Sequence, residues 1–218
     1  MIHAISRNQK RGNLEGRLFE IGNIFLPKAL PLAEYPDEHE MLCAGVFGET
    51  EDFFSLKGLA ETVADTLQLH FEYQEKKVPF LHPYQTAAVF CEGEEIGYLG
   101  KLLYEIQDSE DMRVSAYIME LDLKKLSKWY GKKPVFVPLP QFAEEKRDLA
   151  LVMDKQITCG QVEECIKASC SYISGITLFD VYEWKQIQSD KKSMAFTVVF
   201  TPKEEEFGAE TVDGYVKK

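Results

Sequence analysis

Hydrophobic residues in the first half of the chain follow two different periods. Residues 53–69 carry apolar side chains at intervals of three and four, which predicts one long helix. Shorter apolar runs bounded by turn residues predict strands at 17–25, 41–47, 87–91, 96–100 and 114–121. A short helix is also predicted from about residue 3 to residue 11. The first half is therefore expected to form a mostly antiparallel sheet with one long helix.

The second half of the chain has a simpler order of elements. Strands are predicted at 149–154, 174–184 and 194–201, with one helix ending near residue 169 and another beginning near residue 210. Thr158 and Gln161 have the spacing of a capping box, which places the start of the first of these helices. The order β-α-β-β-α is that of a ferredoxin-like unit without its last strand. We therefore expect an α+β protein.

Prolines divide the two halves. Pro134, Pro138 and Pro140 lie within seven residues, a density that excludes a helix or a central strand. We interpret residues 134–140 as a connector between a first domain at 1–133 and a second domain at 141–218.

Composition limits the possible functions. The chain has 218 residues, of which 45% are hydrophobic and 28% charged, as in globular proteins. No apolar run approaches the ~20 residues of a membrane span, and the first residues contain no apolar signal segment. Five scattered cysteines suit a reducing, cytoplasmic compartment. The net charge of −11 argues against indiscriminate nucleic-acid binding but permits a local site that reads one RNA.

The sequence contains no recognisable catalytic or metal-binding motif. Its four histidines are far apart, and the three cysteines of the second half are spaced by six and five residues, unlike a common zinc motif. No arginine lies between Arg17 and Arg113 to hold a nucleotide triphosphate. Gly93, Gly97 and Gly100 are interpreted as turn residues in and after a hairpin, not as a phosphate-binding loop. We predict no catalytic residue and no metal ligand.

Aromatic and acidic residues alternate along the strand predicted at 174–184. By the period of two, Asp180, Tyr182 and Trp184 share one face with Leu178. The opposite face, which we expect the helices to cover, carries Phe179, Val181 and Glu183. This alternation predicts that Asp180 and Tyr182 lie on an open side of the sheet.

An exposed tyrosine on an open sheet can serve as a stacking platform for a nucleic-acid base. Lys185, Lys191 and Lys192 lie in or near the following hairpin, within reach of a phosphate. The same spacing is also typical of an ordinary amphipathic strand with a tyrosine that has no binding role. The residue pattern leaves both interpretations open.

Several short motifs resemble one family. The sequences RDLALV at 147–152, LFDVY at 178–182 and KSMAF at 192–196 are similar to the ferredoxin-like anticodon-binding domain that ends the β chain of bacterial phenylalanyl-tRNA synthetase. Upstream motifs are similar to the catalytic-like domain of the same chain: NQKRGN at 8–13, RLFEIG at 17–22, FSLKG at 54–58, HP at 82–83 and ELDL at 120–123. The resemblance runs from about residue 5 to residue 218.

The resemblance implies a non-catalytic portion of phenylalanine–tRNA ligase. The first domain would be a partial class II synthetase-like antiparallel sheet domain, which serves as a scaffold for the α chain in an α2β2 assembly. The whole enzyme would use ATP and magnesium to join phenylalanine to its tRNA. This portion would bind neither cofactor and would be inactive alone. We expect a C-terminal portion of a longer β chain, cut at both ends.

The resemblance also assigns site residues. By motif, Asp180, Tyr182 and Ser193 fall near the first anticodon base of phenylalanine tRNA, and Ala150 lies in the facing strand. Glu183 and Trp184 follow the motif where the family has small or basic residues. The alternative is a ferredoxin-like module that senses a small molecule such as an amino acid. A sensor would need a polar pocket between sheet and helices, whereas an anticodon reader needs an open aromatic face.

Overall fold

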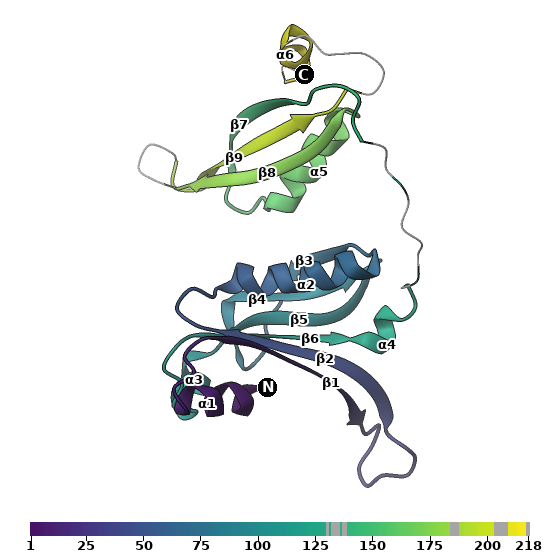
Figure 1. The fold of residues 1–218 in the computed structure, drawn as a ribbon, viewed down its shortest axis with the longest axis vertical. Helices are drawn as coiled ribbons and strands as arrows, with labels where there is room; N and C mark the ends of the chain where they lie inside the picture. Colours follow the sequence, from purple (N-terminus) through teal and green to yellow (C-terminus); the bar gives the residue numbers. More distant parts are fainter. Residues whose placement is uncertain (130, 132–135, 137–138, 184–187, 203–208, 217–218) are drawn as a thin grey trace. The chain divides into compact units, whose positions relative to one another are not determined.

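The computed structural model describes residues 1–129, 131, 136, 139–183, 188–202 and 209–216. The chain divides into two compact units, Met1–Val135 and Phe136–Lys218 (Figure 1). The division falls inside the stretch interpreted as a connector at 134–140, most of which lies outside the described residues. Within the described ranges, no helix is long and apolar enough to cross a membrane.

The first unit is built on a six-stranded antiparallel sheet in the order β1-β2-β6-β5-β4-β3. The strands are β1 (Gly16–Leu26), β2 (Asp37–Phe47), β3 (Phe71–Glu75), β4 (Leu81–Cys91), β5 (Glu94–Leu102) and β6 (Ala116–Asp122). Every strand predicted in this half is confirmed. Strand β3 escaped prediction because only Phe71 among its residues is fully buried, which leaves little alternation to recognise.

Helices pack on both faces of this sheet. On one face, α2 (Phe53–Leu67) buries Leu56, Ala60 and Ala64 in a cluster that includes Val46 and Leu99. On the other face, α1 (Ile2–Lys10) buries Ile5 in a second cluster. The short helix α3 (Tyr104–Ser109) lies beside α1 (Figure 1). The predicted long helix is thus confirmed, and the sheet is covered on both sides.

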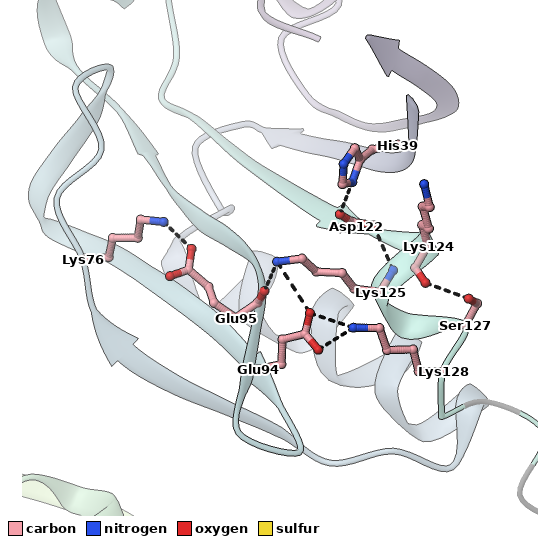
Figure 2. A network of polar contacts seen from close by, with 9 residues as sticks. All are labelled: His39, Lys76, Glu94, Glu95, Asp122, Lys124, Lys125, Ser127 and Lys128. Carbon is pink, nitrogen blue, oxygen red and sulfur yellow. Dashed lines mark hydrogen bonds and ion pairs between the residues drawn. The ribbon is translucent and has the colours of Figure 1, made fainter. Parts of the chain in front are cut away.

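A polar network fixes the last helix of the first unit, α4 (Leu123–Leu126) (Figure 2). Asp122 caps α4 by accepting a 2.9 Å hydrogen bond from the backbone N–H of Lys125, and its other oxygen lies 2.7 Å from His39 Nδ1. The Lys125 ammonium donates to the Glu95 carbonyl at 2.7 Å, and the Lys128 ammonium lies 2.7 Å from Glu94. These contacts tie α4 to β2 and to the β4–β5 hairpin.

The second unit contains an antiparallel sheet in the order β7-β9-β8. Its strands are β7 (Glu145–Asp154), β8 (Ile173–Tyr182) and β9 (Lys191–Phe200), and its helices are α5 (Cys159–Ser169) and α6 (Ala209–Val216). The predicted capping box of α5 is confirmed, because Gln161 N–H donates to Thr158 Oγ1 and Thr158 N–H donates to Gln161 Oε1. The predicted ferredoxin-like order β-α-β-β-α is present.

Both helices of the second unit cover the same side of its sheet. Met194, Phe196 and Val198 of β9 are buried in one cluster with Val162 of α5 and Val212 of α6. Because one cluster unites both helices with alternate residues of the central strand, the intervening residues point away from the helices. One sheet face therefore stays uncovered by the described helices of this unit.

Candidate nucleic-acid interface

The uncovered side of the β7-β9-β8 sheet is the candidate site. Met194 and Phe196 of β9 face the helices, so the residues between them face the other way. The Thr197 hydroxyl donates a 2.6 Å hydrogen bond to Asp148 Oδ1, which places alternate residues of β7 on the same side. We call this surface the open face and define it by these residues: Asp148, Ala150, Val152, Thr177, Asp180, Tyr182, Ser193, Ala195 and Thr197.

The strand register brings the residues assigned by resemblance together. Ala195 of β9 pairs with Ala150 on one side and with Asp180 on the other. Ser193, two residues earlier, pairs with Tyr182. Since paired residues of antiparallel strands project to the same side, all of these lie on the open face in two adjacent rows. The Tyr182 side chain is 39% exposed.

One prediction about β8 is wrong, and a bulge explains it. Leu178 pairs with Phe196 and packs in the core, whereas the alternation predicted that it shares a face with Asp180. The register shifts after Leu178, because Asp180 pairs with Ala195, the next residue of β9. Phe179 is therefore an extra residue that reverses the alternation. It is 57% exposed, contrary to the prediction that helices cover it.

Beyond the bulge, the end of β8 agrees only in part with prediction. Val181 pairs with Met194 on the helix-covered side, as predicted, yet it is 47% exposed. Glu183 forms an ion pair with Lys155 at 3.2 Å. Trp184, predicted to share the face of Asp180, lies outside the described residues.

Two of the three lysines predicted to contact phosphate lie on opposite sides of the sheet. Lys191 pairs with Asp154 at the end of the sheet, and its ammonium lies 3.4 Å from the Asp154 carboxylate. Lys192 pairs with Met153, which packs in the core, so Lys192 belongs to the helix-covered side. Lys185 lies outside the described residues. Of the three candidates, only Lys191 is placed on the side of the open face.

Several residues of the open face were not predicted from the sequence. Val152 pairs with Ser193 and is 60% exposed, so it extends the row of Tyr182 across the sheet. Asp148 and Thr197 form the hydrogen-bonded pair described above. The signal that could have revealed them is the strict alternation of β7, whose residues alternate between partly buried and exposed throughout.

Arg147 directly precedes Asp148 of the open face in sequence, but its guanidinium binds residues on the other side of the sheet. Its guanidinium donates to Asp213 of α6 at 2.9 Å and to Glu145 at 3.1 Å. The hydrogen bond to Asp213, and to a smaller extent the one to Glu145, raises the pKa of Arg147. The arginine therefore joins β7 to α6 on the helix-covered side.

The open face combines groups suited to a nucleic-acid base. An exposed tyrosine ring can stack on a base, and Asp180 and Ser193 can hydrogen-bond to its edge. Ala150 and Ala195 leave space between these groups. Among the described residues, no group of three or more histidine, cysteine or acidic side chains could hold a metal ion.

Comparisons with known proteins agree with the two units. Residues 1–123 match the family described as the phenylalanyl tRNA synthetase beta chain CLM domain, and residues 140–218 match the ferredoxin-fold anticodon binding domain. The strand order β7-β9-β8 with both helices on one side is consistent with the second match.

Curated relatives carry the name phenylalanine–tRNA ligase beta subunit. The Clostridium tetani protein is 33% identical over 203 residues, which cover 92% of this chain and 25% of the relative. The Listeria innocua protein is 32% identical over 234 residues, covering 100% and 29%, and the Bacillus subtilis protein is 30% identical over 226 residues, covering 97% and 28%. The chain thus spans roughly a quarter of the length of these relatives. It belongs to the phenylalanyl-tRNA synthetase β-chain family.

Proposed function

We propose that this chain is a non-catalytic portion of a phenylalanine–tRNA ligase β subunit and that its open face reads the anticodon of phenylalanine tRNA. The observation that carries the proposal is the row in which the exposed Tyr182 ring lies beside Ser193, with Asp180 in the next row. A stacked base gains about 1–3 kcal/mol from an aromatic platform, and the two polar side chains supply selectivity. Family membership favours this reader over the alternative of an amino-acid sensor.

The chain contributes recognition and scaffolding to a larger cytoplasmic enzyme. That enzyme joins phenylalanine to its tRNA with ATP and magnesium, in an α2β2 heterotetramer whose α subunit performs the chemistry. The absence of arginine between Arg17 and Arg113 supports this division of labour, because a triphosphate site needs bidentate cations. The Lys191 side chain, on the side of the open face, adds a phosphate contact near the base-reading rows, whereas Lys192 belongs to the helix-covered side.

A titration separates the reader from the sensor. We expect the chain to bind phenylalanine tRNA, and to bind a tRNA with an unrelated anticodon more weakly, because base contacts specify while phosphate contacts do not. Free phenylalanine should not bind at millimolar concentration. Fluorescence anisotropy of labelled tRNA and calorimetry with phenylalanine measure the two interactions. Saturable binding of phenylalanine, without preference between the tRNAs, would favour the sensor.

A second surface supports the proposed α-subunit partner. Strand β1 is an edge strand of the first sheet, and Phe19, Ile21 and Phe25 project from one side of it. These side chains are 74%, 56% and 59% exposed. Large exposed apolar side chains gathered on one side of an edge strand are typical of a protein interface. The relatives' name, beta subunit, implies a second kind of subunit, and we propose that the α subunit packs on this side of β1.

Phe19→Asp should weaken association with the α subunit. Burying one phenylalanine contributes about 1.5–3 kcal/mol, so the dissociation constant should rise about ten- to hundredfold. Phe179→Asp is the matched control, because Phe179 is also an exposed phenylalanine of a strand but belongs to the second unit. Affinity of the α subunit for each immobilised variant measures the effect. Equal retention of the α subunit by both variants would rule out this side of β1 as the interface.

A further inference from the structure

We infer that the open face holds a second base-reading position, built on Asp148 and Thr197, which accepts a base that carries an exocyclic amino group. The inference rests on the proposed function, because it concerns the same RNA on the same sheet face. It adds a site to that of Tyr182 and extends recognition toward the other end of β7.

The hydrogen bond between Thr197 and Asp148 leaves one oxygen of the Asp148 carboxylate able to accept a hydrogen bond from a ligand. The Thr197 hydroxyl donates to Asp148 Oδ1 at 2.6 Å, which fixes the orientation of the carboxylate. Within the described ranges, Asp148 has no ion pair and no second hydrogen bond from a side chain. The neighbouring cation in sequence, Arg147, projects to the opposite side of the strand and binds Asp213. Asp148 Oδ2 therefore remains available as an acceptor on an exposed surface.

The pair lies too far from Asp180 to serve the same base. Asp148 pairs with Thr197, whereas Asp180 pairs with Ala195, two residues away along the central strand. The two aspartates also occupy the two outer strands, separated by the width of β9. Strand spacing and rise per residue together put their Cα atoms roughly 12 Å apart, beyond the edge of one base.

The surface between the two positions is low and apolar on β7 and β9. Asp180 of β8 lies at the outer end of the row between the Tyr182 row and the Asp148 row, and the rest of that row consists of Ala150 and Ala195. Because their side chains are single methyl groups, bases that are splayed out of a single-stranded loop can approach the sheet on either side of this row. Thr177, which pairs with Thr197, adds another hydroxyl to the Asp148 row.

The carboxylate determines which bases fit. An ionised aspartate only accepts hydrogen bonds, so it pairs with the amino groups of guanine, adenine or cytosine. Uracil has no amino group, and its one edge donor, N3–H, lies between two carbonyl oxygens that a carboxylate repels. An asparagine at the same position both donates and accepts, so it would remove this discrimination against uracil.

The test uses the anticodon stem–loop of phenylalanine tRNA with each loop base replaced in turn. For the parent chain, we expect uridine at one loop position to weaken binding about five- to hundredfold. This position should differ from the one that Asp180→Ala affects. Asp148→Asn should remove most of that penalty, and Asp148→Ala should abolish discrimination there. Asp154→Asn is the matched control, because Asp154 lies on the same side of β7 but is paired with Lys191.

The outcomes separate this inference from the proposed function. A parent chain that shows no preference for the stem–loop overturns both. A parent chain whose binding depends on Tyr182, while folded Asp148 variants keep the parent's preference at every loop position, overturns only the second position. Thr197→Val distinguishes a purely structural pair, which would lower the free energy of unfolding without altering any base preference.

Discussion

Tyr182→Ala should weaken binding of phenylalanine tRNA by about 1–3 kcal/mol, because one base–aromatic stack has that value. The ring is 39% exposed on the open face, where Ser193 pairs with it across the strand. Tyr182→Phe should lose much less, since stacking requires the ring and not the hydroxyl. Titration of labelled tRNA at several salt concentrations measures both variants, because a stacking loss persists at every salt concentration while a phosphate contact does not.

The control for this prediction is another exposed tyrosine. Tyr84 of β4 is 89% exposed and belongs to the first unit, so Tyr84→Ala should leave tRNA binding unchanged. If Tyr182→Ala folds normally and binds as tightly as the parent throughout the salt series, β8 is an ordinary amphipathic strand. Asp180→Ala should affect selectivity more than affinity, because its carboxylate contacts a base edge instead of a ring face.

Local patterns were sufficient for most elements of the second unit. The strand predicted at 149–154 is confirmed as the second part of β7, which begins earlier, at Glu145, and the Thr158 capping box defines the start of α5. The motif LFDVY identified Asp180 and Tyr182, and strand pairing then placed Ser193 beside Tyr182. The bulge at Phe179 could not be predicted, because a phenylalanine carries no local signal for a bulge and the register depends on β9.

Glycines in the first unit illustrate the same limit. Gly97 and Gly100 lie within β5, as the predicted strand at 96–100 requires, and not in a turn. A Cβ added to Gly97 would lie 1.9 Å from the Glu120 carbonyl oxygen of β6, and one added to Gly100 would lie 2.7 Å from the Gln85 carbonyl oxygen of β4. Glycine is required there because neighbouring strands approach closely, and the local sequence does not contain that information.

Short elements were missed for a different reason. The helices α3 and α4 have six and four residues, too few to show a helical period. The position of α4 depends instead on distant partners such as His39 and Glu95 (Figure 2). The candidate site depends on distant partners in the same way. The sequence identifies the residues of each strand, but which of them lie side by side depends on how the strands pair.

The side of the sheet opposite the open face should control stability. Phe196 is fully buried in the core of the second unit, between Leu149 of β7 and Leu178 of β8. Phe196→Ala should lower the free energy of unfolding of this unit by about 3–5 kcal/mol, since it removes a large side chain and leaves a cavity. Phe179→Ala, the same change at a residue that is 57% exposed, should cost far less. Urea denaturation followed by circular dichroism measures both.

The two phenylalanine variants also test whether stability and recognition are separable on this sheet. Phe196 and Ser193 belong to one strand but project to opposite sides, so Phe196→Ala removes no group from the open face. Below its denaturation transition, the Phe196→Ala variant should therefore bind tRNA with the affinity of the parent, reduced only by the unfolded fraction. Tyr182→Ala should show the reverse, with near-parental stability and weaker binding. An equal loss of stability for Phe196→Ala and Phe179→Ala would contradict the assigned register, because only one of these rings lies in the core.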